Sequence, residues 1–323
     1  MKTYFIGLLF LFVGVSPLML SAQSFNEPVE YFNYIAERQR QVLNKHIRYV
    51  SHSVHSDNYR DIERRRIQLI KELNQSIRQL ERIQPLKGDN KLRNTAIEVF
   101  EEYLAAFNVE FKESLSLKQN SQDSYEAMEK YFAAQDKAEE KLQKSGEKFD
   151  KAVEAFAEKH EMQFEKDNES EIADQFKITG EVNSYTRELF LLYFKVSKSN
   201  AGFIDALNER KEGKMAKARE ELIATTAEAL QSIETKSDFK GDKNLLVKTK
   251  SLIEYYQEIA QGDYATLTGI MENQASLTQE QVDQYNQILQ NLPTKEQKMV
   301  NEYTEARTAL MRKFVPDIEV AKK

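Results

Sequence analysis

An internal repeat limits the possible folds of this chain more than any other feature of the sequence. Residues 87–92 read Lys-Gly-Asp-Asn-Lys-Leu and residues 240–245 read Lys-Gly-Asp-Lys-Asn-Leu, with Gly88 and Gly241 153 residues apart. A repeat of this length predicts one supersecondary unit that occurs twice. The similarity continues on both sides at the same offset, in these pairs: Ile70 and Ile223, Ile77 and Leu230, Glu81 and Glu234, Val99 and Leu252, Glu101 and Glu254, Tyr103 and Tyr256.

The composition predicts that the repeated unit is helical. The 323 residues include only five prolines and ten glycines, and no proline lies between Pro85 and Pro293. Ala, Glu, Lys, Gln and Leu are frequent, and these residues lose least on entering a helix. Alternation with period two, which would indicate strands, is rare. We therefore expect an all-α fold of two tandem, duplicated antiparallel helical-bundle units with about four helices each, either separate or sharing a long central helix.

The spacing of apolar residues places eight helices. The fifth carries a heptad seam in residues 178–196, widened by further apolar residues, and is expected to be the most buried helix. The last is expected to break at Pro293, and its Tyr285 and Tyr303 match Tyr131 and Phe149 at an offset of 154. Repeat units are expected in residues 23–170 and 171–323, with the acidic stretch 165–174 as the boundary. The expected helices are 28–55, 57–84, 89–117, 122–164, 178–196, 211–236, 242–261 and 278–315.

The Lys-Gly-Asp sequence has a structural interpretation in both copies. Gly88 and Gly241 are suited to the left-handed conformation that ends a helix. Asp89 and Asp242 are suited to capping the next helix through their side-chain oxygens. The alternative is an adhesion tripeptide for a cell-surface receptor. The structural interpretation accounts for all the residues in both copies, so we expect two turns that each join an antiparallel helix pair.

The N-terminal residues resemble a cleavable export signal. Lys2 precedes an apolar run from Tyr4 to Val15, and Leu20-Ser21-Ala22 places small residues before Gln23. This pattern predicts a signal peptide in residues 1–22 that is cleaved before Gln23, with an uncleaved N-terminal anchor as the alternative. The chain has no cysteine, so lipidation at the export signal and disulfides are both excluded. The expected location is therefore the periplasm or the extracellular space, for a protein that is not a lipoprotein.

Charge and motifs argue against several function classes. After removal of residues 1–22, 45 basic residues stand against 52 acidic ones, a formal charge of −7, which does not favour nucleic acid as a partner. No later segment is apolar enough to span a membrane. The sequence lacks the nucleophile elbow, the phosphate-binding loop, the dinucleotide fingerprint and the zinc-protease motif. We expect no enzymatic activity and no cofactor.

One group of residues has spacing that suits a metal. His52 and His55 would share a helix face, and Asp57 follows them as a third potential ligand. All three lie at a predicted helix end, where such residues are common, so no metal is expected.

The arginine-rich start of the second helix, with Arg60 and Arg64 to Arg66, resembles an anion clamp but is interleaved with Asp61 and Glu63. A charged, exposed helix face is expected there.

The overall pattern resembles a group of bacterial proteins. The paired Lys-Gly-Asp turns, the aromatic segments 100–103 and 253–256 and the absence of cysteine are similar to helical surface or periplasmic proteins of the leptospiral "family surface protein" type. The resemblance extends over most of the chain after residue 22. It implies an exported helical protein and supplies no functional residues.

We therefore expect an exported, non-enzymatic helical protein that binds a protein, peptide or envelope partner. The alternatives are an envelope spacer without a ligand, or a hydrolase or metal-dependent enzyme that uses dispersed carboxylates. A wide apolar or tyrosine-lined groove would favour the binding protein, and smooth charged faces would favour the spacer. Ionisable groups that converge inside a bundle would favour the enzyme. The function is expected where the two repeats differ, above all in residues 178–196 and the arginine-rich segment.

Overall fold

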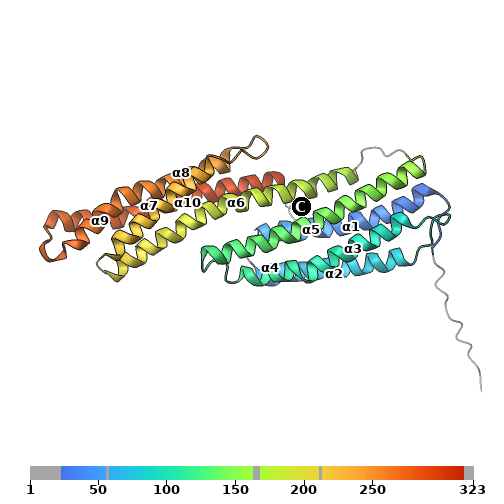
Figure 1. The fold of residues 1–323 in the computed structure, drawn as a ribbon, viewed down its shortest axis with the longest axis horizontal. Coiled ribbons are helices and arrows are strands. Elements are labelled where there is room, and N and C mark those ends of the chain that lie inside the picture. Colours follow the sequence, from blue (N-terminus) through green and yellow to red (C-terminus); the bar gives the residue numbers. More distant parts are fainter. Residues whose placement is uncertain (1–22, 56–57, 163–167, 211–212, 316–323) are drawn as a thin grey trace, which may run out of the picture.

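Helices form nearly all of the chain in the computed structural model, which describes residues 23–55, 58–162, 168–210 and 213–315 (Figure 1). Within these ranges there is no β-strand, only three isolated bridge pairs, so the all-α prediction is confirmed. The export signal predicted in residues 1–22 lies outside them. The helices are α1 Pro28–His55, α2 Tyr59–Glu81, α3 Lys91–Asn108, α4 Glu110–Lys118, α5 Tyr125–Lys159, α6 Asn168–Glu209, α7 Lys214–Ile233, α8 Asn244–Gln261, α9 Asp263–Glu272 and α10 Gln279–Phe314, with a 3₁₀ turn at Gln274–Ser276.

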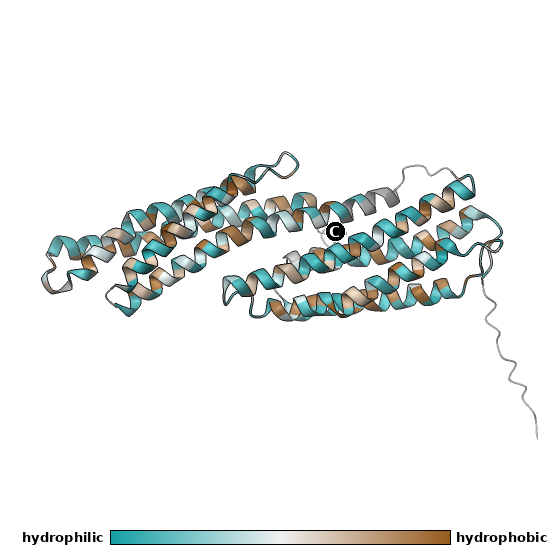
Figure 2. Cartoon of the chain, viewed as in Figure 1, coloured by the Kyte–Doolittle hydropathy of each residue, from teal (hydrophilic) through white to brown (hydrophobic). Residues whose placement is uncertain are grey.

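The buried apolar residues form two large clusters along the length of the molecule. One cluster lies among α1 to α5, where α2 packs on α1 and α3, and α5 packs on α3 and α4. The other lies among α6 to α10, where α7 packs on α6 and α8, and α10 packs on α6 and α8. Apolar and polar residues alternate around the helices, as amphipathic helices require (Figure 2). We call α1–α5 the first half and α6–α10 the second half.

Helix α6 connects the two halves. Its 42 residues would extend about 60 Å. Its beginning contacts α1 and α5, and its remainder contacts α7, α8 and α10 (Figure 1). Between residues 178 and 200 only Glu188 is exposed. A third, small apolar cluster joins α6 to the start of α5 through Phe194 and Phe132. The described part of the predicted boundary, residues 168–174, is therefore helical and continuous with the predicted buried segment.

The structure corrects two of the predicted helices and adds one that was not predicted. The third predicted helix is interrupted at Val109, where φ is −111° and ψ is −73°, and continues as α4. The predicted break at Pro293 is wrong, because α10 runs through it. Proline removes one backbone hydrogen bond there, and the buried Ile288 and Leu292 hold the preceding turns against the core. Helix α9 was missed because residues 262–277 were predicted to be a loop between two helices.

The two Lys-Gly-Asp turns have the same backbone conformation. Gly88 and Gly241 have φ of 85° and 84°, and each follows a lysine that also has positive φ. In each turn the residue before the lysine and the aspartate exchange two backbone hydrogen bonds of 2.8 to 3.1 Å. The sequence suggested the left-handed conformation only for the glycines. The lysines adopt it as well, so each turn contains two consecutive left-handed residues.

The aspartate of each turn makes the same two contacts. The Oδ1 atom of Asp89 accepts the backbone N–H of Lys91 at 3.0 Å, and that of Asp242 accepts the N–H of Asn244 at 3.1 Å. The Oδ2 atoms accept Lys159 Nζ of α5 at 2.7 Å and Lys313 Nζ of α10 at 2.9 Å. Each carboxylate therefore binds the first backbone N–H group of the next helix, from the position before the N-cap residue Asn90 or Lys243, and also binds the end of the last helix in its half.

Substitution of either aspartate by alanine is expected to lower the free energy of unfolding by about 1–2 kcal/mol, because a cap and an ion pair are lost together. Urea unfolding of Asp89→Ala and Asp242→Ala measures this loss. Asn at either position keeps an acceptor for the helix start but removes the charge, so its loss should be smaller. An alanine variant as stable as the wild type would contradict the capping role.

Candidate binding cavity

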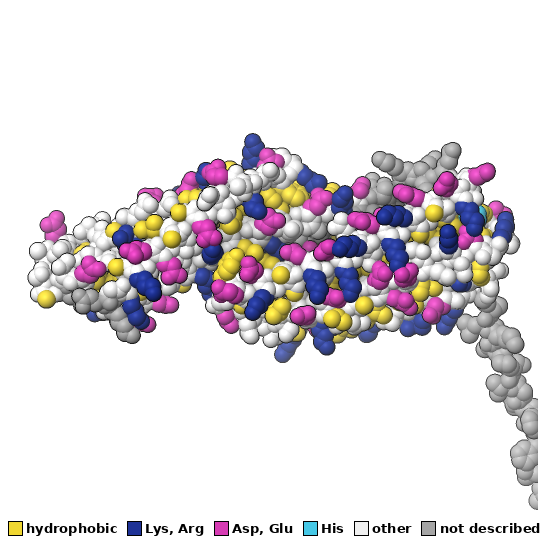
Figure 3. Space-filling view, viewed as in Figure 1, with side chains coloured by type: hydrophobic (Ala, Val, Ile, Leu, Met, Phe, Trp, Pro, Cys, Tyr) yellow, Lys and Arg dark blue, Asp and Glu magenta, His cyan; other side chains and the backbone are white. Residues whose placement is uncertain are grey.

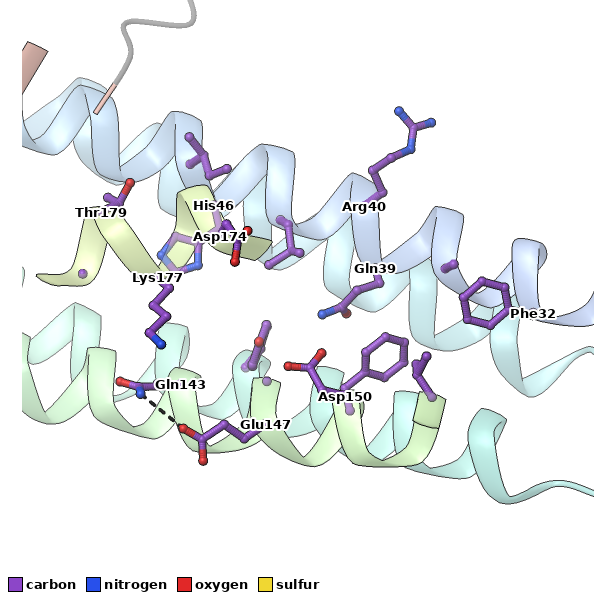
Figure 4. Close-up of a pocket in the computed structure, with 18 of the residues that line it drawn as sticks. Phe32, Gln39, Arg40, His46, Gln143, Glu147, Asp150, Asp174, Lys177 and Thr179 are labelled. Carbon is purple, nitrogen blue, oxygen red and sulfur yellow. Dashed lines mark hydrogen bonds between the residues drawn. The ribbon is translucent and has the colours of Figure 1, made fainter. Parts of the chain in front are cut away.

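A cavity of about 1390 Å³ separates α1 from α5 in the first half. The beginning of α6 and residues 160–162 line the rest of it. Figure 4 shows α1 and α5 on opposite sides of the gap, with side chains from both directed into it. The apolar part of the lining comes from Phe32, Leu43, Ile47, Phe149 and Val153. Most of the remaining lining is polar or charged, so apolar side chains and converging polar groups share one cavity, as they do in binding sites.

The corresponding helices of the second half contact each other. At an offset of 154, α1 corresponds to residues 182–209 of α6 and α5 corresponds to α10, and helices α6 and α10 are in contact. Tyr193 of α6 fills the space between them, with its ring 5.0 Å from that of Tyr303 and 6.5 Å from that of Tyr256. In the first half Gln39 occupies the position that corresponds to Tyr193. A shorter side chain there leaves the space open.

A glycine on α5 enlarges the same gap. Gly146 lines the cavity, and Val300 occupies the corresponding position of α10. A Cβ atom at Gly146 would lie 3.4 Å from Tyr103 Oη, at the near limit of van der Waals contact. Glycine inside a helix costs about 1 kcal/mol relative to alanine. The first half therefore contains two residues, Gln39 and Gly146, that leave volume where the second half is filled.

Gln39 supplies a buried polar group to the cavity. Its side chain is 9% exposed, and Figure 4 shows it directed toward Asp150 across the gap. The amide interacts with the Tyr103 hydroxyl. Among the described residues nothing forms a hydrogen bond with its Oε1 atom. A buried amide oxygen without a donor is costly, so this atom is suited to accept a hydrogen bond from a ligand.

Asp150 faces Gln39 from α5. Burial raises the pKa of its carboxyl group above the ordinary value, and the neighbouring carboxylates of Glu154 and Glu147 raise it further. A cation placed in the cavity would relieve this repulsion and lower the pKa again.

His46 lies at the inner end of the cavity and is 1% exposed. Its ring packs edge-on against Phe107 and Phe111, with centroid distances of 5.3 and 6.2 Å. Burial lowers the pKa of His46 to about 3. The folded protein therefore holds this imidazole neutral at neutral pH.

The free energy of unfolding is expected to fall on acidification because of His46. Its pKa in the unfolded chain is near 6.5, so between pH 6.5 and about 3 the unfolded state binds the proton and the folded state does not. Between pH 7 and pH 4 this group alone should destabilise the fold by about 3 kcal/mol. Urea unfolding at both pH values should show a smaller difference for His46→Gln than for the wild type. Equal differences would contradict the buried neutral state.

Arg187 of α6 binds two carboxylates of α5 that line the cavity. Its Nη1 atom lies 2.5 Å from Asp136 Oδ1 and its Nη2 atom lies 2.5 Å from Glu139 Oε1. Burial raises the pKa of Glu139, and Arg187 opposes that shift. Burial also acts against the charge on Arg187, but the two carboxylates hold its pKa above the ordinary value. This cluster fixes α6 against α5.

Replacement of Arg187 by leucine should destabilise the protein by about 3–5 kcal/mol, because Glu139 then stays buried without its cation. Urea unfolding measures the loss. The double variant Arg187→Leu with Glu139→Gln should recover part of it, since the uncompensated carboxylate is removed. A double variant that is less stable than the single variant would contradict this account of the cluster.

A second polar cluster lies inside the second half. Tyr256 Oη donates to Glu296 Oε1 at 2.7 Å, and Tyr264 Oη donates to Asn200 Oδ1 at 2.7 Å. Asn200 Nδ2 in turn donates to Glu296 Oε1 at 3.4 Å. Burial and the charge of Glu296 raise the pKa of both tyrosines, which therefore remain protonated donors. The groups satisfy one another, as in a structural network.

The structure describes only part of the metal candidate predicted from sequence. His52 is partly buried near the end of α1, the side chain of His55 is outside the described part, and Asp57 is one of the undescribed residues. In the described ranges no group of three or more His, Asp or Glu side chains could hold a metal ion. The helix predicted to start at Asp57 begins after Asn58, whose side chain accepts the N–H groups of Arg60 and Asp61.

The arginine-rich segment has structural partners. Arg66 is buried, binds Glu63 and donates to the Phe107 carbonyl oxygen at the end of α3, and Arg64 pairs with Asp61. On the face shown in Figure 3, Lys and Arg side chains are mixed with Asp and Glu. An anion clamp is therefore not formed by Arg64 and Arg66.

None of the described helices is both long and apolar enough to cross a membrane.

Sequence reasoning missed the cavity and its residues Gln39 and Gly146. The available signal was the offset of 154, which places Tyr193 and Val300 at the positions that correspond to Gln39 and Gly146.

Comparisons with protein-family models, curated proteins and solved structures gave no match. The resemblance to exported helical surface proteins therefore stays a prediction.

Proposed function

We propose that this is an exported, non-enzymatic binding protein built by tandem duplication of a helical unit, and that the cavity of the first half holds its partner. The observation that carries the proposal is the difference between the halves at one place. The space between α1 and α5 is open, while the corresponding space between α6 and α10 is filled by Tyr193. Export rests on the pattern of residues 1–22, and the partner is a protein, peptide or envelope component.

Matched details throughout the two halves support the duplication. The helix interruption at Val109 recurs at Gly262, 153 residues later, with φ of −103° and ψ of −87°. Tyr49 packs against Phe111 in the first half, and the corresponding Phe203 stacks on Tyr264 in the second. Lys159 and Lys313 bind the aspartates of the two turns. Helices α1 to α5 thus correspond in order to α6 to α10.

The binding role is favoured over the two alternatives by the location of the open space. A spacer has no need of a cavity with an apolar lining and a buried amide. The observation in favour of an enzyme is the cluster around Glu296, where ionisable groups converge. That cluster has its hydrogen bonds satisfied internally, and it lies in the half whose corresponding gap is filled.

A photocrosslinking experiment with matched positions tests the proposed function. Gln143 on α5 lines the cavity, and Gln297 is the corresponding exposed residue of α10. A photoreactive amino acid at residue 143, in the protein produced in its own cells, should form one discrete adduct after irradiation. The same amino acid at residue 297 should form none, because Tyr193 fills the space between α6 and α10 and the open hollow at Gln297 is lined by residues of α10 alone. Mass spectrometry of the adduct identifies the partner.

The variant Gln39→Tyr provides the control. It introduces the residue that fills the corresponding gap of the second half, so the adduct at residue 143 should be lost while the fold is kept. Circular dichroism and urea unfolding check the fold. No adduct from either position, or equal adducts from both, would contradict a partner site in the first half.

A further inference from the structure

The first half presents a row of carboxylates to the cavity that the second half lacks. On α5 the positions 136, 140, 143, 147 and 150 follow steps of four and three residues, which places them on one helix face. All of them line the cavity, and all but Gln143 are acidic: Asp136, Glu140, Glu147 and Asp150. We call these five residues the α5 stripe. The corresponding residues of α10 are all neutral: Gln290, Thr294, Gln297, Asn301 and Thr304.

The lining of the cavity contains more carboxylates than cations, although Glu139 pairs with Arg187 and Glu181 pairs with Lys240 outside it. The described lining contains nine carboxylate side chains and only two Lys or Arg side chains, Arg40 and Lys177. Arg40 is already bound to Glu37 and points out of the cavity (Figure 4). Within the α5 stripe, Asp136 binds Arg187 and Glu140 binds Lys144. Glu147 accepts only the neutral amide of Gln143 among the described contacts, at 3.2 Å, and the pKa of Asp150 is raised.

Gln39 gives a second, independent indication of a ligand with hydrogen-bond donors. Its amide oxygen is buried, faces Asp150 across the cavity and lacks a donor among the described residues. Tyrosine at the corresponding position of α6 closes the gap, so glutamine both opens the space and offers an acceptor. The acidic stripe and this acceptor require the same ligand chemistry, which is positive charge with N–H donors.

We propose that the cavity binds a basic amphipathic helix of a partner protein. Three observations favour a helix over a small cation. The volume of 1390 Å³ exceeds the roughly 300–1000 Å³ of ordinary small-molecule pockets. The lining follows α1 from Glu27 to Val50, a length of about 35 Å. The apolar residues lie beside the acidic ones, so an inserted helix would place its apolar face on Leu43 and Val153 and its Lys or Arg residues on the α5 stripe.

This inference rests on the proposed function and is tested with a defined probe. The probe is a fluorescent 21-residue helical peptide with Leu at core spacing and Lys elsewhere. Fluorescence anisotropy with the full mature chain should show binding that weakens as sodium chloride is raised. The variant Glu140→Gln/Glu147→Gln/Asp150→Asn should weaken binding at least tenfold. The control variant Glu220→Gln/Glu221→Gln/Glu272→Gln has the same change of net charge on exposed residues of the second half, and should change binding less than twofold.

Three further probes distinguish a basic amphipathic helix from other ligands of the cavity. A peptide with Glu in place of Lys and a scrambled peptide of the same composition should bind at least tenfold more weakly. Spermine should fail to displace the Lys peptide at equal charge concentration. Equal loss of binding in both triple variants, equal binding of the scrambled peptide, or displacement by spermine would overturn the proposal. If the adduct at residue 143 forms but the Lys peptide does not bind, the ligand class is wrong and the binding function stands; if neither occurs, both fall.

Discussion

The contact of Arg187 with Asp136 and Glu139 decides how the two halves are placed, and the shape of the cavity depends on it. The three side chains join α6 to α5 at a point where Arg187 is buried, Glu139 is partly buried and Asp136 is exposed. A buried ion pair is a weak source of net stability but is strict in its geometry. It therefore determines where the preceding turns of α6 lie over α1 and α5. Those turns, with Thr179 and Asn183, form one end of the cavity.

The cavity is maintained against the tendency of helices to close on each other. The open gap between α1 and α5 loses dispersion contacts that the second half keeps through Tyr193 and Tyr303. The gap persists because the facing surfaces are unsuited to direct packing. Repulsion among the carboxylates of α5 and the uncompensated amide of Gln39 both oppose closure. The first half thus carries a local cost that an inserted, positively charged segment would remove.

The features predicted from sequence are those set by local rules. The all-α class and the ends of α1 follow from helix propensity, and the conformation of the Lys-Gly-Asp turns follows from glycine. The interruption at Val109 and the continuity of α10 through Pro293 follow instead from tertiary packing, since neither residue's local preference would choose them. The same is true of His46, which looks like an ordinary polar residue of α1 until Phe107 and Phe111 of other helices enclose it.

The cavity itself could be found from sequence only by comparing the two halves residue by residue. Neither Gln39 nor the α5 stripe is unusual alone, because a glutamine or a row of carboxylates is normal on an exposed helix face. They become informative beside Tyr193, which fills the space between α6 and α10, and beside the neutral residues at the offset positions of α10. The differences concentrate on two surfaces that face each other across one space. A change on either surface alone would leave a poorly packed bundle, whereas the paired change yields an open site with more carboxylates than cations and one buried acceptor.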